Sequence, residues 1–248
     1  MTMPVPHDAI VPVVILGSAF VSMIVYAITG ADRDPSHEEK GTHLFLGIGD
    51  FLVHWFIWII DPFVAFSVRF GLTPDHHSYI ATAFGVVSAG AMATGHLALG
   101  GWMLAVNGFI DTLDGHLARQ TNQSSSRGDF IDGTLDRFID VGTCLGLLVY
   151  LRHSTWGPLI AASAMGGSLI VSYARARGEV QGINCNGGLM QRPERVVLLS
   201  AACVFDSMVT RLLAWPAGSL VLASLALMAV TTFVTAVHRT IWIAARLH

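Results

Sequence analysis

The composition of this 248-residue chain indicates a membrane environment. Hydrophobic residues make up 53% of it and charged residues only 12%, with a mean hydropathy of +0.59. A soluble domain carries about 25% charged residues, so this chain has too little polar surface to keep a fold of its size in water. The net charge of -3 provides no basic field for nucleic acid, and we expect no nucleic-acid partner.

Apolar runs close to the ~20 residues of a bilayer crossing recur along the chain. The first, 10–29, has no basic region before it, and we expect a retained transmembrane helix followed by a polar linker to residue 47. The next run, 48–70, mixes Trp and Phe with charged residues such as Asp61 and Arg69. This mixture is typical of a helix that lies along the lipid headgroups.

Six further crossings are expected after the break at 71–75. The fold class predicted is an all-α integral membrane protein with a six-transmembrane-helix core, preceded by the interfacial helix and one extra N-terminal transmembrane helix. We expect two parts, 1–47 with the extra helix and linker, and 48–248 with the interfacial helix and the core. The six crossings are predicted at 76–96, 100–119, 128–151, 156–175, 195–212 and 216–243.

The distribution of basic residues predicts the orientation. If the polar loops 30–40 and 120–127 share one side, eleven Lys and Arg residues gather there, while Arg152 and Arg211 lie on the other side. Loops rich in Lys and Arg stay in the cytoplasm. We therefore expect a multi-pass protein of the cell membrane, with its N-terminus outside and the loop after Arg119 inside.

Aspartates recur at helical spacing at the adjacent ends of two successive predicted helices. Asp111 and Asp114 lie at i and i+3, and Asp132 and Asp136 at i and i+4 of the next helix, so each pair shares a helix face. Helices joined by a short loop run antiparallel, so the four carboxylates can converge at the cytoplasmic membrane edge. An ionisable group at the bilayer centre costs at least ~2.5–3.5 kcal/mol, which requires a partner or a task.

Divalent cations would neutralise such a cluster, because four carboxylates in a partly dry volume repel one another. Hard ions with oxygen ligands meet that need, and Mg²⁺ usually serves where phosphates are substrates. Two ions could fit and clamp a diphosphate. Gly115 and Gly128 leave room for a nucleotide, and Arg119 is placed to reach a phosphate. Solvated helix ends are the alternative, and the shared spacing of the four acids argues against it.

This segment resembles the signature of the CDP-alcohol phosphotransferase family. The resemblance continues in weaker form from Thr73-Pro74 to the C-terminus, about seven-tenths of the chain. It implies an interfacial helix followed by six crossings. Asp75 and Asp129 depart from the residues usual at their positions. The matching positions are Asp111-x-x-Asp114-Gly115-x-x-Ala118-Arg119, then eight residues, then Gly128-x-x-x-Asp132-x-x-x-Asp136.

The resemblance also implies an activity and roles for the residues. Family members transfer a phosphate-bearing group from a CDP-linked donor to an alcohol and release CMP, with Mg²⁺ or Mn²⁺, and they are typically homodimers. Asp111, Asp114 and Asp132 would be metal ligands, and Asp136 would be both a ligand and the base that takes the hydroxyl proton. The nucleotide site would comprise Asp111, Asp114, Gly115, Ala118, Arg119 and Gly128.

Arginines farther along the chain favour an acceptor that bears its own phosphate, because bidentate guanidinium contacts fit phosphate. Anchoring to anionic lipid is the alternative role. The runs Ser172-Tyr173-x-Arg175-Ala176-Arg177-x-Glu179 and Arg192-x-Glu194-Arg195 resemble the branch that makes phosphatidylinositol phosphate or archaetidylinositol phosphate. We therefore expect CDP-diacylglycerol or a similar lipid as donor and an inositol phosphate as acceptor. The expected acceptor-phosphate ligands are Arg137, Arg175, Arg177, Arg192 and Arg195.

Several alternatives stay open. The acceptor could be glycerol 3-phosphate, serine or a second inositol phosphate, and a different class, a cation transporter or channel, would also use intramembrane aspartates. Asp61 and Asp140 either extend the polar cleft or face water. The segment 184–188 is expected to be a mobile loop that could close over the acceptor. Three widely spaced cysteines are expected to stay reduced and to serve packing: Cys144, Cys185 and Cys203.

Overall fold

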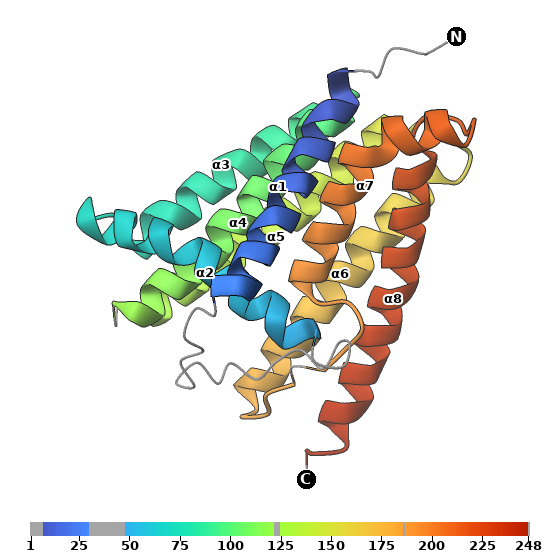
Figure 1. The fold of residues 1–248 in the computed structure, drawn as a ribbon. Helices are drawn as coiled ribbons and strands as arrows, with labels where there is room; N and C mark the ends of the chain where they lie inside the picture. The colour runs from blue at the N-terminus through green and yellow to red at the C-terminus, as the bar shows by residue number, and fades with distance from the viewer. Residues whose placement is uncertain (1–6, 30–47, 122–124, 186, 248) are drawn as a thin grey trace. The chain divides into compact units, whose positions relative to one another are not determined.

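The described part of the chain is all helical, as predicted (Figure 1). A computed structural model describes residues 7–29, 48–121, 125–185 and 187–247. Within these ranges it contains eight α-helices joined by turns and loops. The helices are α1 His7–Thr29, α2 Ile48–Arg69, α3 Pro74–Ala93, α4 Leu97–Gln120, α5 Ser126–Tyr150, α6 Gly157–Val180, α7 Arg192–Leu212 and α8 Ser219–Ala244.

Local chemistry explains where the helices begin and end. Gly95 adopts a φ of +88°, and the amides of Gly95 and His96 donate to carbonyls of the last turn of α3 at 3.0 and 2.9 Å. Only glycine adopts this conformation without strain, so α3 ends three residues before the predicted bound. Ser125 caps α5, and its hydroxyl accepts a hydrogen bond from the Gly128 amide at 3.0 Å.

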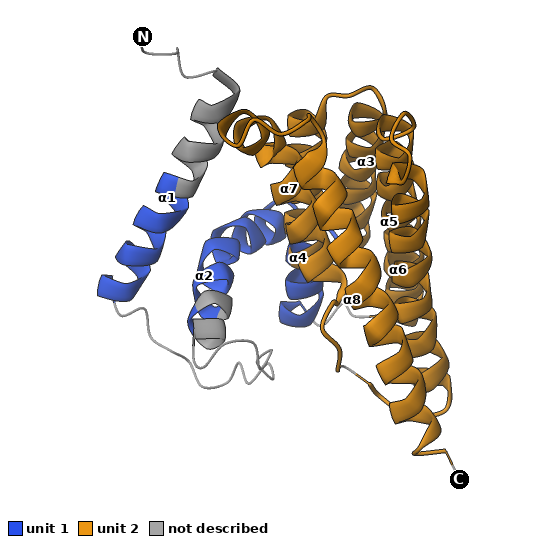
Figure 2. Ribbon diagram, turned by 90° about the vertical axis from the view of Figure 1, so that its right-hand side faces the viewer, with its two compact units in different colours: residues 1–74, 113–123 blue, residues 75–112, 124–248 orange. Residues whose placement is uncertain are grey.

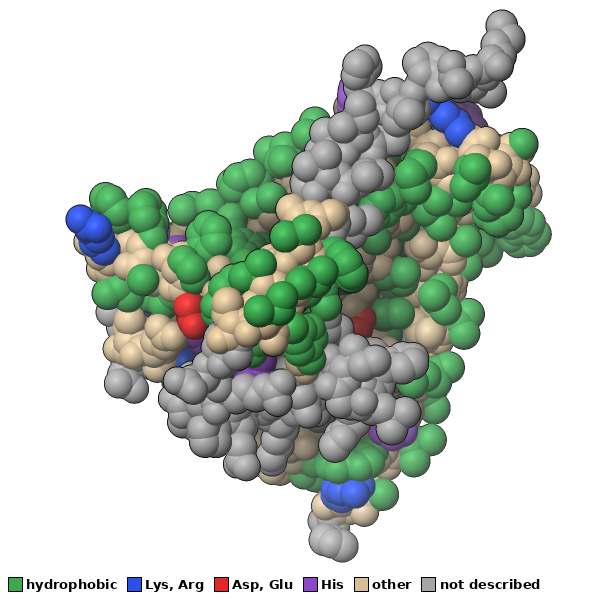
Figure 3. Space-filling model, viewed as in Figure 1, with side chains coloured by type: hydrophobic (Ala, Val, Ile, Leu, Met, Phe, Trp, Pro, Cys, Tyr) green, Lys and Arg blue, Asp and Glu red, His purple; other side chains and the backbone are tan. Residues whose placement is uncertain are grey.

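The described helices differ in how well their length and hydropathy suit a bilayer crossing. Among the helices that the structure describes, α6 and α8 are long and apolar enough to cross a bilayer. The number rises to three if residues 54–69 of α2 and the helix α3, which a short break separates, are counted together as one span. The predicted crossings α4, α5 and α7 are not among these candidate spans, and each holds charged residues of the predicted site. Among the residues coloured by type in Figure 3, hydrophobic side chains are numerous and charged ones few.

The structure divides into two compact units (Figure 2). The first comprises residues 1–74 and 113–123, and the second comprises 75–112 and 124–248. In the first unit, Tyr26 of α1 packs against Phe51 and Trp58 of α2, with ring centroids 5.5 and 5.8 Å apart. Trp55 also donates a hydrogen bond to Ser22 at 3.1 Å. Aromatic contacts therefore hold α1 against α2.

Small residues bring the helices of the second unit close together. α6 packs against α5 and α8, and α7 packs against α8. A Cβ atom on Gly101 of α4 would lie 2.7 Å from the Ser200 carbonyl oxygen of α7, and one on Gly167 of α6 would collide with the Thr232 side chain of α8. Close backbone approach of this kind replaces the hydrophobic driving force that helices lack in lipid.

The three cysteines are buried and unpaired, as predicted.

A buried carboxylate joins α7 to α8. Asp206 is 2% exposed, and it accepts hydrogen bonds from the amides of Gly218, Leu220 and Val221 at 2.8, 3.1 and 3.3 Å. These amides belong to the first turn of α8 and its cap, where helical N–H groups lack partners and the helix dipole favours negative charge. Asp206 therefore fixes the turn at this end of the unit.

The contact between α6 and α8 can be tested with two adjacent glycines. We expect Gly167→Ala to destabilise the protein by about 1–3 kcal/mol, because the added methyl group forces the two helices apart. The control is Gly166→Ala, since a Cβ there meets nothing within 4 Å. The measurement is the apparent melting temperature in detergent. Equal melting temperatures for the two variants would contradict the close contact.

Candidate active site

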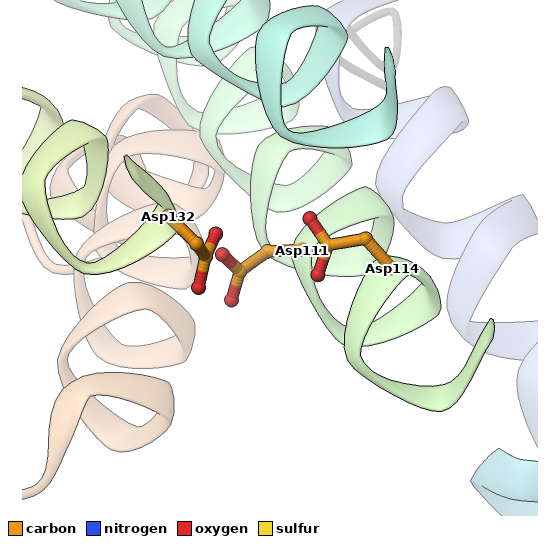
Figure 4. Close-up of side chains that lie close together, drawn as sticks. All are labelled: Asp111, Asp114 and Asp132. Carbon is orange, nitrogen blue, oxygen red and sulfur yellow. The ribbon is translucent and has the colours of Figure 1, made fainter. Parts of the chain in front are cut away.

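Three of the four predicted metal-ligand aspartates lie together at the ends of α4 and α5. Asp111 and Asp114 lie one turn apart on the continuous helix α4, and Asp132 approaches from α5 (Figure 4). One carboxylate oxygen from each lies within 4.8 Å of the others. Asp114 is buried, while Asp111 and Asp132 are half-buried. Three hard oxygen donors at this spacing have the chemistry that Mg²⁺ or Mn²⁺ requires.

Asp136, the fourth predicted ligand, lies one turn farther along α5. Among the described residues, the close carboxylate group does not include it. Its carboxylate instead lies 2.6 Å from a terminal nitrogen of Arg192 and 3.7 Å from one of Arg137. Asp136 therefore lies between the group of three close aspartates and the side chains of Arg137 and Arg192.

Arg192, the first residue of α7, bridges the aspartates of α4 and α5. Its Nη1 donates to Asp111 Oδ2 at 2.6 Å, its Nη2 lies 2.6 Å from Asp136 Oδ1, and its Nε lies 3.8 Å from Asp140 Oδ1. Burial disfavours the charged guanidinium, and the surrounding carboxylates offset this cost. Arg192 is therefore a permanent internal cation among the acids.

Asp140 continues the acidic face of α5 into the helix bundle. It lies four residues after Asp136, and its Oδ2 accepts hydrogen bonds from Arg195 Nη2 and Ser168 Oγ, both at 2.9 Å. The Arg195 side chain is 3% exposed and that of Asp140 is 9% exposed. Of the two possibilities open for Asp140, the structure selects the buried one. The i+4 spacing from Asp136 signalled this role, whereas nothing in the sequence marked Ser168.

A pocket of about 740 Å³ lies beside Asp136, between α5 and α6. Two of the five predicted acceptor arginines, Arg137 and Arg175, line it. Arg175 donates from Nε to Glu179 at 2.8 Å, so a pocket carboxylate occupies its guanidinium. The lining residues are Asp129, Phe130, Asp132, Gly133, Thr134, Asp136, Arg137, Leu169, Ser172, Tyr173, Arg175, Ala176 and Glu179.

The other predicted acceptor arginines lie elsewhere. Arg177 is exposed in the last turn of α6 and does not line this pocket. Arg192 and Arg195 are held by the aspartates of α4 and α5. The structure thus brings two of the five guanidinium groups to the pocket, and a third, that of Arg192, contacts the pocket residue Asp136.

The predicted nucleotide-binding residues lie at the ends of the same two helices. Gly115, Ala118 and Arg119 occupy the last turns of α4, where the Arg119 side chain is exposed. Gly128 lies in the first turn of α5, and a Cβ there would lie 3.2 Å from Ser125 Oγ and 3.5 Å from Asp75 Oδ1. A side chain at 128 would therefore crowd the capping hydroxyl of Ser125, whereas its contact with Asp75 of α3 would be an ordinary van der Waals contact.

Asp61 is the second aspartate whose position the sequence left open. Its side chain is 52% exposed, and its Oδ1 lies 3.4 Å from Nε2 of His116, which is buried. The same ring nitrogen lies 3.0 Å from the Gln120 amide nitrogen. Within the first unit, Asp61 of α2 therefore contacts the end of α4.

The part of the chain that contains the candidate site is similar to known proteins. The family model described as CDP-alcohol phosphatidyltransferase matches residues 71–242, more than half of the chain. Phosphatidylinositol phosphate synthase of Mycobacteroides abscessus is 35% identical over 61% of this chain and 70% of its own length. Archaetidylinositol phosphate synthase of Methanothermobacter thermautotrophicus is 34% identical, over 57% of this chain and 70% of its own.

Solved structures resemble this chain at the level of the whole fold. The crystal structure of Mycobacterium tuberculosis phosphatidylinositol phosphate synthase with CDP-DAG bound has a TM-score of 0.65 and 26% identity, covering 75% of this chain and 93% of that one. The same enzyme in complex with manganese and citrate has a TM-score of 0.65 and 27% identity, covering 74% and 88%. Because the family model spans the aspartates of α4 and α5 together with Arg192 and the pocket, this chain belongs to the CDP-alcohol phosphatidyltransferase family.

Proposed function

We propose that this chain transfers the phosphatidyl group of CDP-diacylglycerol, or a similar CDP-linked lipid, to a hydroxyl group of an inositol phosphate and releases CMP. One observation carries this proposal. Asp136 lies between the close carboxylate group of α4 and α5 and a pocket lined by Arg137 and Arg175. The names of the relatives and the CDP-DAG bound to the M. tuberculosis enzyme support the same donor and acceptor.

Asp111, Asp114 and Asp132 would hold a divalent cation, Mg²⁺ or Mn²⁺, with Asp136 as the fourth ligand. The manganese in the M. tuberculosis structure supports this assignment. A bound ion would neutralise the carboxylates, polarise the attacked phosphorus and stabilise the leaving phosphate, and four carboxylates offer enough ligands for two ions. The nucleotide would lie against Gly115, Ala118, Arg119 and Gly128, together with Asp111 and Asp114.

Asp136 would act as the general base, because it lines the pocket in which the acceptor hydroxyl would lie. Arg137 and Arg175 would bind the acceptor phosphate, with Arg175 exchanging its Glu179 partner for that phosphate. Arg192 adjoins the pocket through Asp136 and would contribute a third guanidinium. Arg177 and Arg195 complete the proposed set at its periphery.

The membrane arrangement is part of the proposal. α1 would be an extra transmembrane helix, α2 an interfacial helix and α3–α8 the six crossings, as two parts, 1–47 and 48–248. The excess of basic residues supports an active site at the cytoplasmic face of the cell membrane, with the N-terminus outside. Homodimer formation is proposed from the family resemblance.

The alternative functions can be distinguished by whether CMP is released and with which acceptor. A cation transporter or channel would move ions without releasing CMP, and its acids would form a continuous path. Here Arg192 and Arg195 form ion pairs with three of the acids, Asp111, Asp136 and Asp140. Family membership also favours the enzyme. A related enzyme with another acceptor would release CMP with glycerol 3-phosphate, serine or a second inositol phosphate.

An acceptor panel tests the proposed reaction. With purified protein and CDP-diacylglycerol, we expect CMP release with inositol phosphate in Mg²⁺ or Mn²⁺ and none in excess chelator, because the aspartates then lack their ions. Unphosphorylated inositol should react far more slowly, since it offers the pocket arginines no charge. Faster CMP release with glycerol 3-phosphate or serine would reassign the acceptor, and ion flux in liposomes without CMP would reassign the class.

The role of Asp136 is tested by Asp136→Asn. We expect transfer to fall by about 10²–10⁴-fold, because the amide cannot take up the hydroxyl proton. Metal-dependent binding of the CDP-linked donor, measured separately, should persist in part. Asp129→Asn is the control, since Asp129 lines the same pocket. Turnover of Asp136→Asn near that of the wild type would remove Asp136 from the base role.

The acceptor pocket is tested by Arg175→Ala. We expect the KM for inositol phosphate to rise at least about tenfold, because a hydrogen bond to a charged group is lost, while the donor KM changes little. Arg246→Ala controls for a general loss of positive charge, since Arg246 stacks on Trp242 at 3.5 Å near the C-terminus. Equal changes of the two KM values would favour a lipid-anchoring role for Arg175.

A further inference from the structure

The segment between α6 and α7 is bonded to α8 immediately before it reaches the active site. The sequence predicted a mobile loop at 184–188, and α7 begins with Arg192. Thr235 of α8, which is 1% exposed, accepts hydrogen bonds at its Oγ1 from the amides of Leu189 and Met190, at 3.1 and 3.3 Å. One buried hydroxyl therefore holds two consecutive amides of this segment.

Arg239, one turn after Thr235 on α8, is hydrogen-bonded to the same segment. Its side chain is 2% exposed, its Nε donates to the Gly187 carbonyl at 2.9 Å, and its Nη1 donates to the Val171 carbonyl of α6 at 3.2 Å. A buried guanidinium is costly unless it is hydrogen-bonded. This guanidinium uses its N–H groups to join α6, α8 and the segment.

Gly188 allows the segment to lie this close to α8. Its φ is +140°, and a Cβ at this position would collide with the Thr235 side chain. Any other residue at 188 would be strained and would push the chain away from Thr235. The segment 187–190 is therefore fitted to α8 by its backbone.

The bonded segment ends two residues before Arg192, and this short distance links α8 to the active site. Gln191 is the N-cap of α7 and makes no side-chain capping hydrogen bond. The bonding of residues 187–190 to Thr235 and Arg239 is therefore a restraint on the start of α7, in addition to the packing of α7 against α8. Arg192 in turn lies 2.6 Å from both Asp111 and Asp136.

We propose that Thr235 and Arg239 are positioning residues that, through segment 187–190, hold Arg192 between Asp111 and Asp136. The effect on catalysis rests on the proposed function, in which Arg192 adjoins the acceptor pocket. The effect on the backbone does not rest on it, because the hydrogen bonds of Leu189 and Met190 exist in the resting protein.

The test compares Thr235→Val with Thr235→Ser in the full-length protein in detergent or lipid. Valine keeps the shape of threonine but removes the acceptor oxygen, and serine retains it. We expect amide hydrogen exchange at Leu189 and Met190 to become roughly 2- to 10-fold faster in Thr235→Val. The KM for inositol phosphate should rise by a similar factor with the donor KM unchanged, and Thr235→Ser should restore both values.

Two threonines of α8 supply matched controls. Thr231 and Thr240 each donate to a carbonyl four residues earlier in α8, at 2.7 and 2.8 Å. Thr231→Val and Thr240→Val should leave the exchange rates and both KM values at wild-type levels. If they change these values as much as Thr235→Val does, the effect is a general response of α8 and the proposal is wrong.

The outcomes also separate this proposal from the proposed function. Unchanged exchange at Leu189 and Met190 in Thr235→Val overturns the positioning role whatever the activity of the protein. Faster exchange with an unchanged acceptor KM overturns the link to Arg192. Absence of CMP release from the wild-type protein with every acceptor overturns the proposed function, and the exchange measurement still decides whether Thr235 holds the segment.

Discussion

Compensation of negative charge is the constraint on which the active-site end of this protein depends. Asp132, Asp136 and Asp140 follow one face of α5, and carboxylates at this spacing in a poorly solvated setting repel one another unless cations lie among them. Arg192 and Arg195, one turn apart at the start of α7, supply two of those cations at 2.6 and 2.9 Å. The position of α7 is therefore tied to the acids of α5 by electrostatics as well as by packing.

α8 shows how one helix serves both lipid and the active site. One of its faces carries exposed apolar side chains such as Val230, Val234 and Val237, which suit hydrocarbon. Its buried face carries the polar residues Thr235 and Arg239, which are satisfied by backbone groups of neighbouring segments. Hydrogen bonds to these groups inside the protein lower the cost of carrying them on a helix that faces lipid, while α8 also organises the segment before α7.

The sequence was most informative where local rules decide the structure. The apolar runs predicted all eight helices to within a few residues. Helical spacing predicted that four aspartates would converge, and three of them, Asp111, Asp114 and Asp132, form the close group, while Asp136 lies one turn farther along α5. It could not place Arg192 between Asp111 and Asp136, because that contact depends on the axial register of α7 against α4 and α5, which no local pattern encodes. For the same reason, nothing in the sequence indicated that Ser168 of α6 would donate a hydrogen bond to Asp140. Asp140 itself could have been assigned to the acidic face of α5, because it follows Asp136 by four residues.

The bonding of residues 187–190 to α8 has a consequence for how the length of this chain can vary. Interhelical connections ordinarily tolerate insertions and deletions. One residue added between Leu189 and Arg192 would lengthen the short link between the segment bonded to α8 and the first residue of α7, and would loosen its hold on the Arg192 guanidinium. Length changes among natural or engineered versions should therefore be confined to the part of the connection before Gly187, and the stretch from there to α7 should keep a constant number of residues.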